Sequence, residues 1–235
     1  YSFCRINNVT CSGSSTIEVR SGNRNLGPED AENVSAGIIF QPDFLPDSAG
    51  KASLSLDYWS IREKSVIGIE GGQIQLLYDY LLRLDGQTNP NIVRDPPVGT
   101  NKVGQVVQVN DNYFNITPRQ LAGFDAGLRY DLKNTGLGSF TFTANAAKLT
   151  KFNQDPTEIT RKLTEANAAG RLGSGIVITA AGNQIGVNGN PAWRGSASLT
   201  WRLKEWRAGA FVNYVGSVND TGPAPVNGQL FKVDS

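Results

Sequence analysis

Seven side chains in this sequence are candidates for binding a ligand. They share one face of the chain, because they stand at alternate positions in four stretches where polar and apolar residues alternate. Carboxylate, guanidinium, amide and indole groups in such an array can hold a polar ligand by hydrogen bonds and ion pairs. They can equally form a hydrated ladder of charges that pairs with neighbouring strands, or a surface on which another domain packs. The candidate ligand-contacting residues are Asp57, Trp59, Asp125, Arg129, Arg194, Arg202 and Asn213.

Catalytic and metal chemistry find little support in the same residues. The chain has no histidine, which rules out a Ser-His-Asp triad, and it has no phosphate-binding glycine loop between a strand and a helix. Asp125 and Asp131 would lie about 20 Å apart along one strand, whereas glycosidase carboxyl groups lie within about 5 to 9.5 Å of each other. We therefore predict no enzyme, no metal site and no cofactor.

Cysteine content and net charge restrict the function further. The two cysteines, Cys4 and Cys11, are too few for a zinc site without histidine. A disulfide that closes a small loop in an oxidising compartment fits their spacing, and two free thiols are the alternative. The 22 basic and 21 acidic residues give a net charge of +1, which provides no general attraction to nucleic acid.

The elements that must position the candidate residues are strands. Between residues 194 and 214 the apolar and polar residues alternate on both sides of a break at 204–206, which predicts a β-hairpin. Similar alternation predicts further strands, about seven in all, and the absence of a strand–helix–strand rhythm makes neighbours antiparallel. The other predicted strands cover residues 32–41, 51–62, 105–132 with a bend near Pro118, and 140–146.

The connections alternate between short turns and long excursions. The turns lie at 42–50, 133–138 and 204–206, and the long loops at 1–29, 64–104, 153–190 and after 218. The apolar residues Ile74, Leu77, Leu81 and Leu84 have helical spacing, which predicts a helix within 72–86. Such a helix could cover a ligand entrance or simply fold a long loop. A second helix is predicted within 157–170.

The apolar faces of these strands could meet a protein core or lipid. A soluble β-sandwich also alternates, so a secreted adhesin or carbohydrate-binding module is the alternative function. Three features favour an outer-membrane β-barrel: charges in the polar sets, aromatic residues near strand ends such as Tyr130, Trp201 and Tyr214, and long loops on one rim with tight turns on the other. Because seven strands and a terminal loop do not close a barrel of even strand number, we expect the chain to be a fragment. An outer-membrane barrel enzyme is a weaker third hypothesis.

Several short stretches resemble TonB-dependent outer-membrane receptors, in that family's order and over nearly the whole chain. "SGNRNLGPEDAENVSAGIIFQP" (21–42) resembles the family's N-x-x-L-x-P-E segment, and "LSLDYWSIREKSVIGI" (54–69) is similar to its Asp-Tyr-Trp-x-Ile strand. Later stretches with the same likeness are "RDPPVG" (94–99), "NYFNITPRQLAGFDAGLRYDL" (112–132) and "PAWRGSASLTW" (191–201).

The resemblance implies an all-β antiparallel transmembrane barrel segment of about seven strands from a 22-stranded barrel with a plugged lumen and long extracellular loops. It implies one domain over 1–235, with the plug domain and the final strands absent, in the bacterial outer membrane. It also implies import of a scarce nutrient, such as a siderophore, cobalamin or an oligosaccharide, with energy from the TonB complex acting through the missing plug. Partners would be that complex, the ligand and outer-membrane lipid, and a Cys4–Cys11 bond would lie in an extracellular loop.

Overall fold

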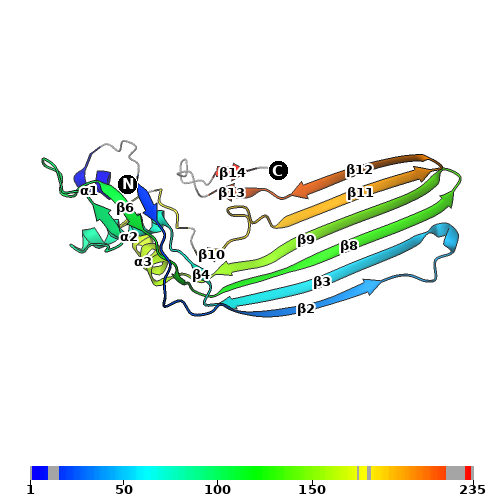
Figure 1. Cartoon of the computed structure of the whole chain (residues 1–235), viewed down its shortest axis with the longest axis horizontal. Helices are drawn as coiled ribbons and strands as arrows, with labels where there is room; N and C mark the ends of the chain where they lie inside the picture. The colour runs from blue at the N-terminus through cyan, green and yellow to red at the C-terminus, as the bar shows by residue number, and fades with distance from the viewer. Residues whose placement is uncertain (1, 10–15, 174, 179–180, 221–230, 234–235) are drawn as a thin grey trace. The chain divides into compact units, whose positions relative to one another are not determined.

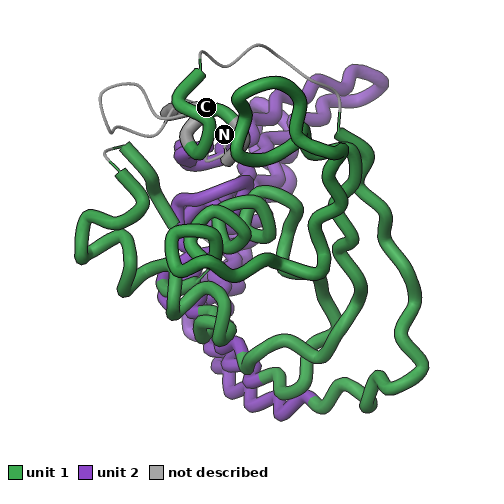
Figure 2. The backbone as a smooth tube through the Cα atoms, turned by 90° about the vertical axis from the view of Figure 1, so that its left-hand side faces the viewer, with its two compact units in different colours: residues 1–30, 63–118, 154–182 green, residues 31–62, 119–153, 183–235 purple. Residues whose placement is uncertain are grey.

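The computed structural model describes residues 2–9, 16–173, 175–178, 181–220 and 231–233. Contacts divide the chain into two compact units, which Figure 2 distinguishes by colour. One unit, here called the sheet unit, contains residues 31–62, 119–153 and 183–235. The other, the helical unit, contains residues 1–30, 63–118 and 154–182. Each long loop predicted from the sequence before residue 190 therefore falls largely in the helical unit.

The sheet unit is built on one long antiparallel sheet (Figure 1). Its strand order is β12-β11-β9-β8-β3-β2, and the two-residue strand β10 (Gly182–Asn183) pairs with β9, which brings the sheet to seven strands. The antiparallel sheet predicted from alternation is therefore confirmed, although its seventh strand, β10, was not predicted. The six long strands are β2 (Asp30–Phe40), β3 (Lys51–Lys64), β8 (Arg119–Thr135), β9 (Gly138–Gln154), β11 (Trp193–Leu203) and β12 (Trp206–Val215).

Tight connections join these strands in pairs at one end of the sheet, here called the turn end. The β2–β3 connection contains the short 3-10 helix η1 (Asp47–Ala49), and residues 204–205 connect β11 to β12. Lys204 adopts a positive φ of 52°. Gly138, which follows the β8–β9 turn, adopts a positive φ of 107°. Positive φ costs glycine nothing, and a single left-handed residue of another type is tolerated in a tight turn.

The register fixes which residues share a face. Thr200 lies opposite Thr141 on β9 and Gly209 on β12. Ser198 lies opposite Thr143, and the two hydroxyl oxygens are 2.7 Å apart. These residues define the polar face of the sheet. The positions between them define the apolar face, which on these three strands carries Phe140, Phe142, Ala144, Ala146, Gly195, Ala197, Leu199, Trp201, Leu203, Trp206, Ala208, Ala210, Val212 and Tyr214.

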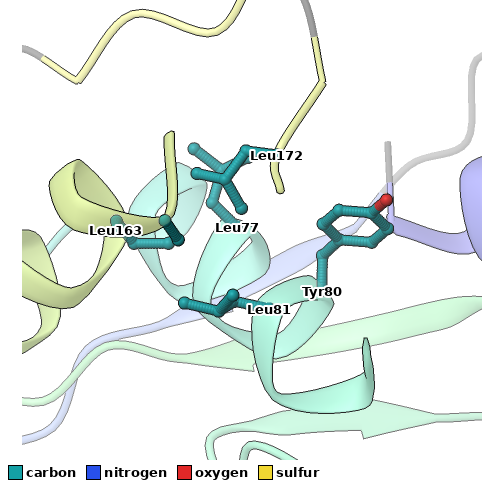
Figure 3. Close-up of a cluster of buried hydrophobic side chains, with 6 residues drawn as sticks. Leu77, Tyr80, Leu81, Leu163 and Leu172 are labelled. Atoms are coloured by element: carbon teal, nitrogen blue, oxygen red, sulfur yellow. The ribbon is translucent and has the colours of Figure 1, made fainter. Parts of the chain in front are cut away.

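The helical unit has a compact hydrophobic core between α2 (Gly72–Leu84) and α3 (Glu158–Ala168) (Figure 3). Both helices were predicted, α2 from the spacing of its apolar residues, and α3 begins where the Thr157 side chain accepts a hydrogen bond from the Thr160 amide at 3.0 Å. Leu84, the last member of the predicted stripe, is 47% exposed instead. The buried core consists of Leu77, Tyr80, Leu81, Leu163, Ala166 and Leu172.

Short strands account for the rest of the helical unit and differ from the sequence prediction. The expected strand 105–132 is three elements: β6 (Val106–Asn110) pairs with β1 (Ile17–Val19) and β5 (Ile92–Arg94), the two-residue β7 (Phe114–Asn115) follows it, and β8 belongs to the long sheet. Helix α1 (Ser2–Asn7) was not predicted. The remaining pairs are β4 (Ile67–Gly68) with β7 (Phe114–Asn115) and, in the sheet unit, β13 (Val218–Asp220) with β14 (Phe231–Val233).

Asp111, which follows β6, should make the helical unit less stable as pH rises. Its side chain is buried, and Oδ2 accepts the Gly71 amide at 2.9 Å while Oδ1 has no partner among the described residues. Burial raises the pKa of Asp111, the Gly71 hydrogen bond opposes the rise, and the nearby Glu18 carboxylate adds to it. The folded state therefore binds the proton more tightly than the unfolded chain, whose pKa is near 3.8. The stabilisation is complete below that pKa and is lost as pH rises through the raised one.

Asp111→Asn keeps the acceptor for Gly71 and removes the titration. We expect hydrogen exchange of the α2 amides to quicken between acidic and neutral pH in the unaltered protein, beyond the intrinsic pH dependence of exchange, and to lose this excess in the variant. An identical excess in both proteins would refute this role of Asp111.

Candidate functional site

The candidate site is the polar face near the middle of the long sheet. A Cβ added to Gly123 would lie 2.6 Å from the Trp59 ring, and one added to Gly127 would lie 2.7 Å from the Ser55 hydroxyl. In an antiparallel pair these two contacts place Asp57 directly opposite Asp125. Neither carboxylate has an ion pair or hydrogen bond with any residue that the structure describes. Like charges directly opposite each other destabilise a sheet, so this pair suits contact with a positively charged or hydrogen-donating group from outside.

Four of the seven predicted residues surround one open hollow of about 530 Å³. Asp57 and Asp125 come from β3 and β8, Arg194 from β11 and Asn213 from β12. Arg194 donates a hydrogen bond to the Gly189 carbonyl at 3.2 Å. The hollow exists because the wall between these long side chains is made of small ones: Ser55, Gly127, Asn145, Ala147 and Ser196.

The other three predicted residues lie elsewhere on the polar face. Trp59 packs over Gly123, one same-face step from Asp57. Arg129 is bonded to Asp131 by two hydrogen bonds, of 2.7 and 3.0 Å, and lines a separate hollow of about 420 Å³. Arg202 lies near the turn end, opposite Arg207. The seven residues thus share a face but not a single site, and their contact with a ligand stays a prediction.

Close packing at Gly123 gives a direct test of this arrangement. An added methyl group would meet both the Trp59 ring and, at 2.7 Å, the Lys148 carbonyl oxygen, which belongs to backbone and cannot move aside. We expect Gly123→Ala to lower the free energy of unfolding by about 1–3 kcal/mol, as overpacking does. Gly209→Ala is the control, because its Cβ would meet nothing nearer than 3.6 Å. Unfolding by denaturant in detergent should separate the two variants; equal stabilities would contradict the packing described here.

The apolar face has aromatic residues at two levels. Near the start of β11, Trp193 stacks under the Lys148 ammonium group, which lies 5.0 Å from the ring centroid. Near its end, Trp201 donates its indole N–H to the Leu137 carbonyl at 2.7 Å. Eight residues separate the two tryptophans, which is about 27 Å along a strand and about 21 Å across a bilayer at the tilt of barrel strands. That spacing is close to the height of the lipid-facing band in outer-membrane barrels.

Between these levels the apolar side chains are uncovered. Leu199 is 46% exposed and Val212 is 61% exposed, and no second layer formed by described residues of the sheet unit packs on them. On the neighbouring strands the rings of Tyr58 and Phe124 lie 5.2 Å apart and are both partly exposed. A soluble sandwich would bury such residues, so the sandwich alternative fails on this face. Among the residues that the structure describes, no helix is both long and apolar enough to cross a bilayer.

The groups on the polar face are of kinds that bind a polar ligand or a packed domain. No group of three His, Cys, Asp or Glu residues that could hold a metal ion occurs within the described part of the chain. Hydroxyls, amides and charged groups spread over five strands can form hydrogen bonds and ion pairs with a polar ligand or with a packed domain. Cys11 lies outside the described residues, so the Cys4–Cys11 disulfide stays a prediction.

One face of this sheet exposes apolar residues between two levels of aromatic residues, and the other face carries hydroxyl and charged groups. A sheet with these two faces is the wall of a transmembrane β-barrel. Residues 2–235 match the family described as TonB dependent receptor-like, beta-barrel. The chain belongs to this family, whose members are outer-membrane receptors that act in transport rather than as enzymes. No curated protein matches the chain.

Sequence reasoning missed two features of the polar face. The opposition of Asp57 and Asp125 depends on the register between strands that are more than 60 residues apart, which alternation does not reveal. Arg207 was not singled out, although it lies opposite Arg202 across the short 204–205 turn. Counting back from that turn would have paired the two arginines.

Proposed function

We propose that this chain forms part of a receptor that binds a scarce nutrient, such as a siderophore, cobalamin or an oligosaccharide, and imports it with energy transduced by TonB. The sheet of this family member supports the proposal most. One of its faces is apolar and exposed, and the other is polar and carries a hollow lined by charged residues. The polar face lines the lumen, and the helical unit belongs to the extracellular side. TonB would act through a plug domain that fills the lumen.

The main role of the charged residues around the hollow is to form a hydrated surface against which another domain packs. Direct contact with the ligand is their secondary role. The Asp57–Asp125 pair and Arg194 lie on the same face, and small residues between them leave room for side chains from another domain. A plug that presents a basic side chain to the two aspartates would remove their mutual repulsion.

Growth of a strain that lacks the gene tests the proposed transport. The strain is grown on a panel of iron chelates, cobalamin and oligosaccharides, each supplied as the sole source of its nutrient. The deletion strain should fail to grow on one of them. A strain without TonB should fail on the same source, and the intact gene should restore growth only where TonB is present. Normal growth of the deletion strain on every source, or restoration without TonB, would refute the proposed function.

A further inference from the structure

A row of basic residues crosses the polar face near the turn end. Arg202 on β11 lies opposite Ser139 on β9 and Arg207 on β12. The row extends to Lys133 on β8. Lys133 is two residues after Asp131 and therefore lies on the same face of the strand. That face is the polar one, because the Asp131 carboxylate accepts a 2.7 Å hydrogen bond from Thr141, a residue of the polar face. Lys133, Arg202 and Arg207 are here called the basic row, and all three are exposed.

No described residue forms an ion pair with the basic row, although the charge of Lys133 acts on the Asp131 carboxylate. None of its three side chains forms an ion pair or hydrogen bond with a described residue. Asp131, the nearest acid on this face, already holds Arg129 by two hydrogen bonds. Glu205, in the β11–β12 turn, forms no ion pair with a described residue. Directly opposed arginines on one face of a sheet repel each other, so the row gains stability from any anionic group that binds it.

We propose that the basic row docks an acidic polypeptide segment on the polar face. The row spans four neighbouring strands, a width of about 14 Å at about 4.8 Å per strand. An extended segment of about five residues covers that width, so two or more carboxylates within such a segment would meet all three cations. Arginine guanidinium groups hold carboxylates in paired hydrogen bonds. Anionic lipid is the wrong occupant, because the face that meets lipid is the opposite one.

A segment can reach the row only if the polar face lines a lumen, as proposed above. The two proposals remain separable, because transport is read by TonB-dependent growth and docking by chemical contact. If growth proves independent of TonB while the row still contacts an acidic segment, the proposed function fails and the docking stands. If growth depends on TonB and the row contacts no such segment, only the docking fails.

Zero-length carbodiimide crosslinking of the full-length protein in its native membrane tests the docking, because it joins an amine to a carboxylate only in contact. Lys133 can react directly, and Arg202→Lys makes the centre of the row reactive while it keeps the charge. We expect both to join to one acidic peptide outside residues 119–215, identified by mass spectrometry. Arg207→Glu should abolish the Lys133 crosslink, whereas Arg207→Lys should preserve it. Lys148, on the apolar face, is the control and should not join to that peptide.

Three outcomes would overturn the docking. The first is crosslinking of Lys133 and position 202 only to Asp131 or Glu205, which would show that the row is neutralised locally. The second is no crosslink at either position. The third is capture of phospholipid, rather than peptide, by a benzophenone side chain placed at position 202.

Discussion

Ala197→Arg should destabilise this protein in a membrane far more than the same charge placed three residues away. Ala197 lies midway between Trp193 and Trp201 on the apolar face, opposite Ala144 and Val212. At that depth an arginine on the lipid face costs about 2–4 kcal/mol. We expect the free energy of unfolding, measured by denaturant titration in lipid vesicles, to fall by that amount.

Thr200→Arg is the matched control on the same strand. Thr200 belongs to the polar face and its side chain is exposed, so an arginine there reaches water and should change stability by no more than about 0.5 kcal/mol. If the two variants lose equal stability, or Thr200→Arg loses more, the assignment of lipid to the apolar face is wrong.

Asp79→Ala should unfold much of the helical unit while the long sheet stays intact. Asp79 is fully buried and accepts hydrogen bonds from Arg94 at 2.7 Å, Arg83 at 3.0 Å and the Asn89 amide at 3.2 Å. Only 7% of the Arg94 side chain is exposed, so loss of the carboxylate removes a 2.7 Å ion pair from a buried cation. Removing one member of a buried pair costs about 3–5 kcal/mol. Hydrogen exchange of residues 72–94 should quicken accordingly.

Asp85→Ala removes a different ion pair of the same unit and is the control. Asp85 lies 2.6 Å from Arg171, but their side chains are 54% and 41% exposed, and a pair of this kind contributes about 0–1 kcal/mol. A second variant, Asp79→Leu with Arg94→Met, should recover part of the lost protection by replacing the buried pair with apolar contacts. Exchange that is equally fast in Asp79→Ala and Asp85→Ala would refute the structural role of the buried pair.

Alternation in the sequence predicted the strands, their faces and the class of fold, because the two faces of this sheet meet different media. Helix α2 followed from the spacing of Ile74, Leu77 and Leu81, all of which pack in or against the core. The strand expected over 105–132 was wrong in its first part. Residues 106–110 also alternate, but their partners are β1 and β5 of the helical unit, and local pattern carries no information about partners so distant in sequence.

The candidate site could be predicted only as a face. Which residues meet on that face depends on register, and register across β3 and β8 follows from contacts such as Trp59 with Gly123. The same limit applies to Asp79 and Arg94, which are 15 residues apart and were not singled out from the sequence. Asp79 is two positions from both Leu77 and Leu81 and so lies on the other side of the helix from the apolar stripe, which left no signal in the sequence for that buried pair.

Single cysteines along β11 test the central claim, that lipid covers one face of the sheet and water the other. Leu199 and Thr200 are both exposed in the isolated sheet, so exposure alone predicts equal reactivity. In native membranes, with Cys4 and Cys11 replaced by serine, a thiol reagent that cannot enter lipid should label Thr200→Cys and Arg202→Cys far faster than Leu199→Cys and Trp201→Cys. Equal labelling at all four positions, or faster labelling at 199 and 201, would contradict the claim.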